Sequence, residues 1–88
     1  MSSTMDLMRE HLAGIEPIDI EITDDSAKHA GHAGAQSGGG HYRLRIVSLQ
    51  FEGKPMMARH RMVYHALGSL MQQDIHALSI TANTPNEL

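Results

Sequence analysis

The stretch IDIEIT, residues 18–23, alternates apolar side chains with acidic or hydroxyl ones at every step. This period of two is typical of a strand with one buried and one solvated face. A second segment of the same kind runs from His41 to Phe51. On its buried side we expect Tyr42, Leu44, Ile46 and Ser48. We expect the two strands to pair as an antiparallel hairpin across the loop 26–40.

Outside this hairpin the apolar spacing changes from two to three and four, which indicates helices. A short helix is expected to begin after Thr4 as its N-cap and to end before Pro17. The longest helical pattern lies between Pro55 and Gln73, and a third strand is predicted at 76–82. The expected apolar stripe of the long helix, with Arg59 and Arg61 off it, comprises Met62, Val63, Ala66, Leu67, Leu70 and Met71. The predicted order is therefore helix, strand, strand, helix, strand.

The composition fits one small intracellular domain spanning residues 1–88. The chain has 88 residues, 41% of them apolar, seven methionines and no cysteine. It can form neither a disulfide nor a thiolate metal site, so packing must supply its stability. No apolar run approaches the roughly 20 residues that a bilayer requires, and the first residues lack the features of a signal peptide. We expect a cytoplasmic protein that does not enter membranes and is a monomer when alone.

Charge is unevenly distributed along the chain, although the net charge is only −3. The charged residues of 1–25 are mostly acidic, whereas those of 41–65 are mostly basic. The basic segment could meet an anionic partner. Alternatively, the two segments neutralise each other in the fold. Net acidity counts against a strong nucleic-acid binder, which is normally basic.

The loop 26–40 is rich in glycine, alanine and histidine and carries no bulky apolar residue. Loops of this length within a compact domain are often functional, although a tolerated surface insertion has the same composition. The chain has seven histidines, and five lie in suggestive places: His29, His32, His41, His60 and His76. Neutral imidazole binds zinc and iron, but the spacing alone does not define a site. A histidine loop that binds zinc or haem unaided remains one interpretation.

Catalytic motifs are absent from the sequence. There is no cysteine nucleophile, no G-x-S-x-G turn and no Walker-type phosphate loop. The tetrad GHAG at 31–34 matches the letters of the GXXG clamp of KH domains. That clamp joins two helices, whereas this tetrad lies between two predicted strands. We therefore expect a protein that is not an enzyme.

Several short motifs, in this order and spacing, resemble the BolA family from about residue 5 to residue 87. They are Asp25-Ser26-x-x-His29, His41-Tyr42, Ile46-Val47-Ser48, Phe51-x-Gly53, Arg59-His60-Arg61-x-Val63-Tyr64, His76-Ala77-Leu78-Ser79-Ile80 and Thr84-Pro85-x-Glu87. The resemblance implies an α+β fold of the αββαβ type, similar to a class II KH domain but without the GXXG clamp. It also implies a three-stranded mixed sheet with the helices packed on one face.

The resemblance further implies an adaptor that pairs with a monothiol glutaredoxin and shares a [2Fe–2S] cluster with it, in cluster trafficking or iron sensing. The glutaredoxin cysteine and glutathione would supply thiolates. His76 would be the ligand on the last strand and His29 the loop ligand, with His32 competing for that role. Because the chain has no cysteine, it resembles the histidine-loop type. The isolated protein would carry no cofactor.

The basic residues Lys54, Arg59 and Arg61, together with His60, form a second candidate site. The motif Arg59-His60-Arg61 would contact either a glutaredoxin or DNA. A structural interpretation is that it caps the helix and orients it against the sheet. The alternative function is a DNA-binding transcriptional regulator of the BolA type, whose affinity would fall sharply with salt.

Overall fold

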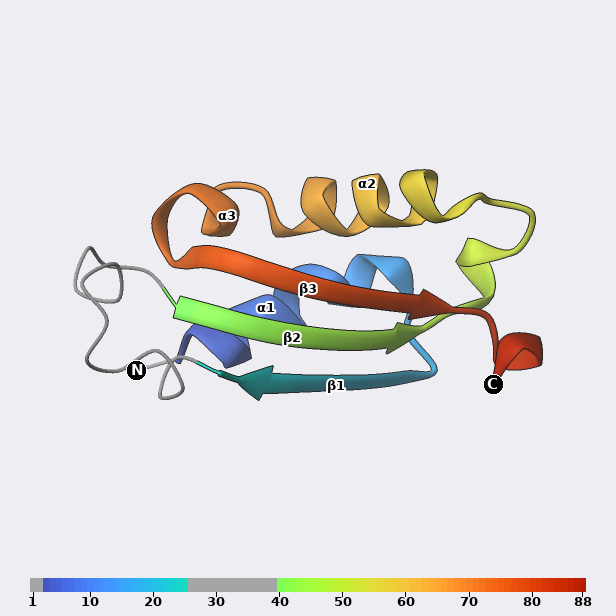
Figure 1. Cartoon of the computed structure of the whole chain (residues 1–88), viewed down its shortest axis with the longest axis horizontal. Helices are drawn as coiled ribbons and strands as arrows, with labels where there is room; N and C mark the ends of the chain where they lie inside the picture. The colour runs from blue at the N-terminus through green and yellow to red at the C-terminus, as the bar shows by residue number, and fades with distance from the viewer. Residues whose placement is uncertain (1–2, 26–39) are drawn as a thin grey trace.

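The computed structural model describes residues 3–25 and 40–88. Its main elements, in chain order, are α1 (Thr4–Leu12), β1 (Asp19–Asp24), β2 (Gly40–Val47), α2 (Met56–Leu67), α3 (Leu70–Gln73) and β3 (Ile75–Asn83). Short 3₁₀ turns follow α1, β2 and β3. The predicted order of helix, strand, strand, helix, strand is confirmed, except that the second helix is in two pieces (Figure 1).

The sheet is mixed, with β2 as its central strand. β1 pairs with β2 in antiparallel fashion, as the sequence predicted, whereas β2 and β3 are parallel. A parallel pair needs a crossover connection, and α2 with α3 provides it. The starts of β2 and β3 therefore lie at the same end of the sheet (Figure 1).

The core lies between one face of the sheet and the helices. Alternate strand residues point toward the helices, including Ile22 on β1 and Leu44 and Ile46 on β2. They meet helix residues that are fully buried: Met8, Leu12, Val63 and Leu67. The period of two in the strands and of three to four in the helices thus produces one continuous core. Within residues 3–25 and 40–88, no helix is long and apolar enough to cross a membrane.

The other face of the sheet is polar, and its charges pair across the strands. Arg45 donates to Asp19 at 3.1 Å, and Arg43 donates to Asp25 at 2.6 Å. Both arginines belong to the basic segment and both acids to the acidic segment. The interpretation that the two segments neutralise each other in the fold is confirmed for these pairs. The Arg45–Asp19 pair is exposed on both sides and contributes little to stability, whereas the side chain of Asp25 is only 15% exposed.

The first helix begins one residue earlier than predicted. Ser3, not Thr4, is the N-cap, and its hydroxyl accepts a hydrogen bond from the backbone N–H of Asp6. The Asp6 carboxylate accepts in return from the backbone N–H of Ser3, which completes a capping box. Three consecutive hydroxyl residues, at positions 2–4, make the sequence ambiguous, and only the spacing to Asp6 distinguishes them.

The second strand is shorter than the predicted range of 41–51. β2 ends at Val47, where the Ser48 hydroxyl donates to the carbonyl of Ile15 at 2.7 Å and accepts from the backbone of Gln50. A 3₁₀ turn then follows and places Phe51 in the core. The apolar Phe51 extends the predicted strand too far because alternation alone does not reveal where a turn begins.

The predicted single helix up to Gln73 is also wrong. α2 ends at Leu67, and Gly68 has φ 54° and ψ −126°, a conformation that side-chain-bearing residues rarely adopt. The short helix α3 follows. Leu67 and Leu70 are nevertheless both buried. The apolar spacing therefore continues across the break and conceals it.

Candidate functional site

His76 and His41 lie together at the end of the sheet where β2 and β3 begin. Their ring centroids are 5.1 Å apart and the rings are tilted by 44°. His76 is exposed and His41 is half-buried. The strand register is irregular between Gly40 and His41, so His41 pairs with Ala77 rather than with His76. Parallel pairing places the starts of both strands at this end of the sheet, and the two imidazoles lie there side by side.

Hydrogen bonds hold the backbone at this end of the sheet, which is called the sheet edge below. The N–H of Gly40 donates to the carbonyl of Asp74 at 2.9 Å, and the N–H of Asp25 donates to the carbonyl of His41 at 2.7 Å. A Cβ at Gly40 would collide with the ring of Tyr42, which explains the glycine at the start of β2. The end of β1 and the starts of β2 and β3 thus meet at one place.

The predicted loop ligands His29 and His32 lie outside the described residues. The described residues on either side of that segment, Asp25 and Gly40, are both at the edge that carries His41 and His76. Among residues 3–25 and 40–88, no three metal-binding side chains gather into one group. The described chain therefore offers two imidazoles and no complete ligand set.

His41 is the site residue that the predicted ligand pair omits. The sequence marks it only as the residue that opens the second strand. Parallel pairing of the second and third strands would place both strand starts at the same edge of the sheet. That topological step is the signal that could have found His41.

The residues of Arg59-His60-Arg61 have separate environments. Arg61 is exposed on α2, as is Lys54 just before the helix. His60 is half-buried, and its Nε2 has no hydrogen-bond partner among the described residues. Arg59 is only 7% exposed. Burial leaves Arg59 little surface for DNA or a partner, and it favours the structural interpretation of this residue.

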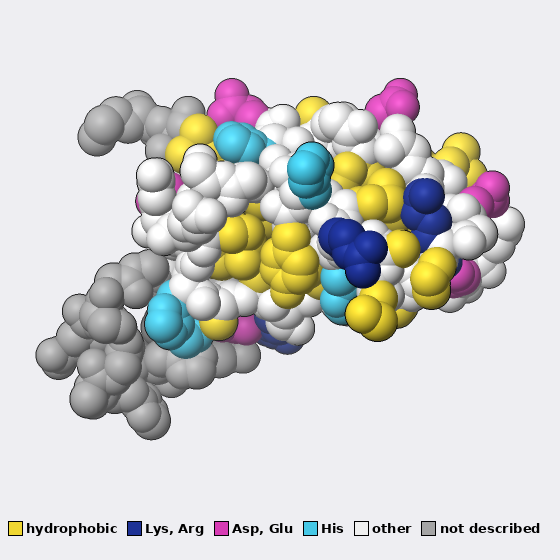
Figure 2. All heavy atoms as spheres, turned by 90° about the horizontal axis from the view of Figure 1, so that it is seen from above, with side chains coloured by type: hydrophobic (Ala, Val, Ile, Leu, Met, Phe, Trp, Pro, Cys, Tyr) yellow, Lys and Arg dark blue, Asp and Glu magenta, His cyan; other side chains and the backbone are white. Residues whose placement is uncertain are grey.

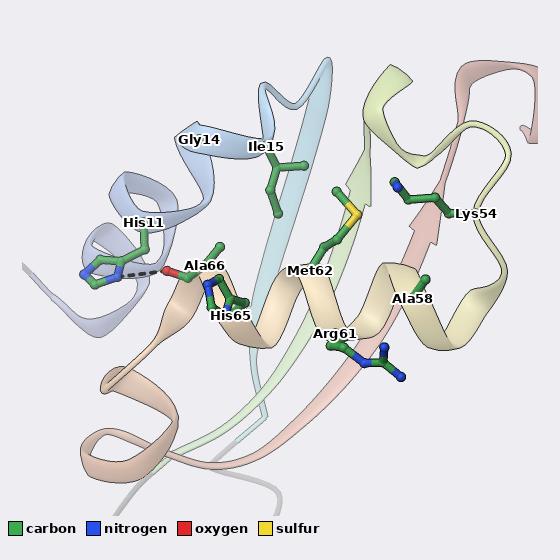
Figure 3. Close-up of a pocket in the computed structure, with 9 residues that line it drawn as sticks. All are labelled: His11, Gly14, Ile15, Lys54, Ala58, Arg61, Met62, His65 and Ala66. Carbon is green, nitrogen blue, oxygen red and sulfur yellow. Dashed lines mark hydrogen bonds between the residues drawn. The ribbon is translucent and has the colours of Figure 1, made fainter.

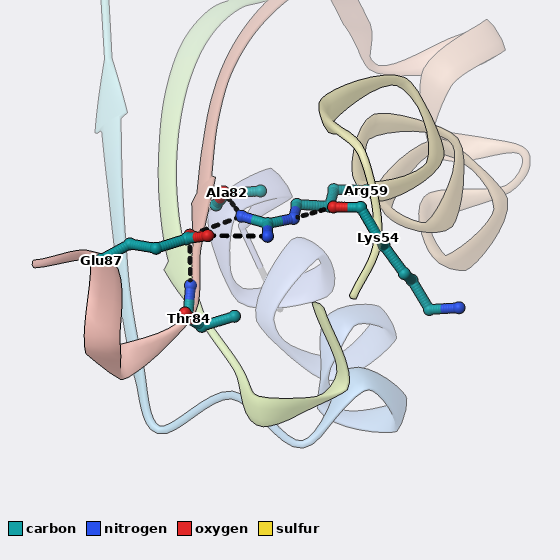
Figure 4. Close-up of polar contacts among 5 residues, drawn as sticks. All are labelled: Lys54, Arg59, Ala82, Thr84 and Glu87. Atoms are coloured by element: carbon teal, nitrogen blue, oxygen red, sulfur yellow. Dashed lines mark hydrogen bonds and ion pairs between the residues drawn. The ribbon is translucent and has the colours of Figure 1, made fainter. Parts of the chain in front are cut away.

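Arg59 ties α2 to β3 and to the C-terminal turn (Figure 4). Its Nε donates to the carbonyl of Lys54 at 2.8 Å, and its Nη1 donates to the carbonyl of Ala82 at 3.0 Å. Nη1 and Nη2 also bind the two carboxylate oxygens of Glu87 in a bidentate pair. The guanidinium carbon lies 5.9 Å from the centre of the Phe51 ring. The prediction that Arg59 lies off the buried face of the helix is corrected by these contacts.

The same pair changes the titration of Glu87. Hydrogen bonds from Arg59, and then from the backbone N–H of Thr84, lower the pKa of Glu87 from its ordinary value of 4.5 to about 2. Both bonds favour the charged carboxylate, which explains the direction of the pKa shift.

We expect acid to weaken the folded state through Glu87. Because its folded pKa is lower than its unfolded pKa, the stabilisation is present above pH 4.5 and is lost as the pH falls toward about 2. Melting temperatures across this range should fall more steeply for the wild type than for Glu87→Gln, which cannot titrate. Parallel curves for the two proteins would contradict this role of Glu87.

The fold and the sheet edge define a small α+β protein built on a mixed three-stranded sheet. The sequence model described as BolA-like protein matches residues 12–87, and the chain belongs to the BolA-like family. It is 44% identical over 84 residues to protein BOLA1, chloroplastic, of Arabidopsis thaliana, covering 91% of this chain. It is 33% identical over 75 residues to the DNA-binding transcriptional regulator BolA of Escherichia coli, covering 85% of this chain and 69% of the regulator.

Comparison with solved structures supports the same family assignment. The BolA domain of SufE1 from Arabidopsis thaliana superposes with a TM-score of 0.85 at 40% identity, covering 100% of this chain and 99% of that one. The chain spans about half of Arabidopsis BOLA1, at 52%, and about a fifth of the Arabidopsis SufE-like protein 1, at 21%. Family and fold are thereby established.

Proposed function

We propose that this protein is an adaptor that binds a monothiol glutaredoxin and supplies histidine ligands to a [2Fe–2S] cluster shared between them. The observation that carries the proposal is the pair His41 and His76, with rings 5.1 Å apart at one edge of the sheet. The described residues that flank the segment with His29 and His32 lie at the same edge. Iron–sulfur centres with two histidine ligands are known chemistry.

The ligands that this chain offers fit part of a cluster site shared with a partner, but they do not make a complete cluster site. A [2Fe–2S] cluster takes four protein-type ligands, normally thiolates, and this chain has no cysteine. The described residues also lack a group of three ligands. A partner that brings the thiolates would complete the set. The proposed role is therefore that of one half of a joint site.

Two properties of the edge suit this role. His76 extends from a paired strand, so its backbone is fixed before any partner arrives. His41 lies beside it and offers a second imidazole when the loop histidines are not engaged. A ligating imidazole must be neutral at the binding nitrogen, so retention of the cluster should weaken as the pH falls through the histidine range. Replacing thiolates by neutral imidazoles also removes negative charge, which favours the reduced state.

The proposal is tested by adding the protein to a monothiol glutaredoxin that carries its cluster and glutathione. We expect a changed visible circular dichroism spectrum and a one-to-one heterodimer on size-exclusion chromatography. Either protein alone serves as the reference. An unchanged spectrum and no heterodimer would contradict the adaptor function. Iron or zinc binding without the glutaredoxin would instead favour a self-sufficient histidine loop.

DNA binding is the second candidate, and the name of the Escherichia coli relative is the observation that favours it. The charges of this chain count against DNA binding, because Arg59 is buried and Arg43 and Arg45 are paired with acids. Among residues 3–25 and 40–88, few cations remain for phosphates. A DNA affinity that falls with salt by a logarithmic slope of about −0.9 for each phosphate contact would support it.

A further inference from the structure

A groove of about 610 Å³ runs between α1 and α2, away from the two histidines of the sheet edge. Its floor is apolar: Ile15, from the turn after α1, and Met62, from α2, point into the space between the helices (Figure 3). Ala58 and Ala66 lie one turn to either side of Met62 and leave room above the floor. At one end, His11 Nδ1 hydrogen-bonds with the carbonyl of Ala66 at 3.2 Å and ties the two helices together.

Basic side chains surround this floor, and no carboxylate of the described residues lines it. Lys54 lies at one end, Arg61 lies on the outer side of α2, and His11 and His65 lie at the other end (Figure 3). Neither Lys54 nor Arg61 has an ion-pair partner within residues 3–25 and 40–88. Figure 2 shows this face, on which blue and cyan side chains border hydrophobic ones and acidic side chains lie only toward the edges.

The length of the groove matches two turns of a helix. Ala58 and Ala66 are separated by about 12 Å along α2, at about 1.5 Å of rise per residue. Anchors at positions i, i+4 and i+7 of a partner helix span a similar distance. Met57 lies one turn before Arg61 on α2, so the two residues share one side of the helix, and Met57 is 75% exposed. Methionine side chains at such positions adapt readily to an incoming apolar surface.

We propose that the groove between α1 and α2 binds a short amphipathic helix of a partner protein, with apolar anchors on the floor and flanking acids on Lys54 and Arg61. This surface contains neither His41 nor His76. A partner could therefore occupy it whether or not a cluster is held at the sheet edge. The inference does not depend on the proposed cluster function.

The apolar floor favours a helix over a nucleic-acid strand. Phosphates and sugars are recognised by cations and polar donors, whereas the surface of this groove is mostly apolar and includes Ile15, Met62 and two alanines. The cations form a border around that wall and do not fill it. Leucine-like anchors with acidic neighbours complement both parts of the surface, and a phosphate backbone complements only the border.

A synthetic 14-residue helical peptide tests this proposal, with leucines at i, i+4 and i+7 and glutamates between them. Fluorescence anisotropy should show binding at low salt, and the amide resonances of Ala58, Met62 and Ala66 should shift. The double variant Lys54→Glu/Arg61→Glu should bind at least about tenfold more weakly. Arg9→Glu, a single reversal on α1 outside the groove, should leave the affinity within about twofold.

Two further variants distinguish binding in the groove from binding at another surface. Gly14 lines the groove and a Cβ there would meet nothing within 4 Å, so Gly14→Phe should fill the space, keep the fold and weaken peptide binding. His76→Ala should bind the peptide as the wild type does, whatever becomes of the cluster function. No binding at millimolar peptide, equal binding by the double variant, or equal binding of a peptide with lysines in place of glutamates would each overturn the proposal. Duplex DNA that displaces the peptide would overturn it in favour of a nucleic-acid site.

Discussion

The His76→Ala variant is expected to lose the histidine-ligated form of the cluster shared with a glutaredoxin while keeping its fold. The side chain is exposed at the start of β3 and is not among the core residues, so its loss should move the melting temperature by only about 2 °C or less. The new visible circular dichroism signal of the mixture should disappear, because no other described imidazole occupies that strand position.

Two histidine variants provide the controls for this result. His65→Ala removes another exposed imidazole, on α2, and should leave the spectrum intact. His41→Ala removes the neighbour and should weaken or alter the spectrum, since its ring lies 5.1 Å from that of His76. A wild-type spectrum in both His76→Ala and the double variant of His29 and His76 would show that the proposed ligands are wrong.

The Arg59→Ala variant is expected to lose more stability than any of the histidine variants. It removes four hydrogen bonds at once, leaving the carbonyl of Ala82 without its guanidinium donor and the carboxylate of Glu87 with only the backbone N–H of Thr84 among the described residues. The Arg59 side chain is 8% exposed and that of Glu87 40%, so the main loss is that of the buried guanidinium and its hydrogen bonds to backbone carbonyls. In a domain of this size we expect the melting temperature to fall by about 10 °C or more.

The matched control is Arg61→Ala on the same helix, which removes an exposed arginine and should change the melting temperature by about 2 °C or less. Arg59→Lys keeps the charge but cannot reproduce the bidentate geometry, so its melting temperature should lie between those of the wild type and Arg59→Ala. Equal melting temperatures for Arg59→Ala and Arg61→Ala would contradict the structural role of the buried guanidinium.

The sequence is sufficient for the element order because each strand and helix has a distinct apolar period. The stretch at 18–23 forms most of β1, with Ile20 and Ile22 facing the core as that pattern requires, whereas Ile18 precedes the strand and is 59% exposed. The predictions from sequence are wrong where backbone geometry, rather than apolar periodicity, determines where a helix or strand ends. Gly68 interrupts a helix whose apolar spacing continues, and Ser48 ends a strand although Phe51 still fits the apolar pattern.

The candidate site is harder to predict because it depends on long-range pairing. His76 follows from the family resemblance, whereas its proximity to His41 follows only from the parallel register of β2 and β3. The partnership of Arg59 with Glu87 links residues far apart in the chain. Local sequence marks Arg59 as one cation among several, and only its burial and its contacts in the fold distinguish it from Arg61.

The measurement that tests the central claim most directly is pulsed electron paramagnetic resonance on the reduced complex with glutaredoxin, since it detects nitrogen nuclei bonded to iron. We predict strongly coupled nitrogen from imidazole in the wild-type complex and its loss or reduction in the His76→Ala complex. A heterodimer with a fully loaded cluster and no strongly coupled nitrogen would contradict the claim that this chain supplies histidine ligands.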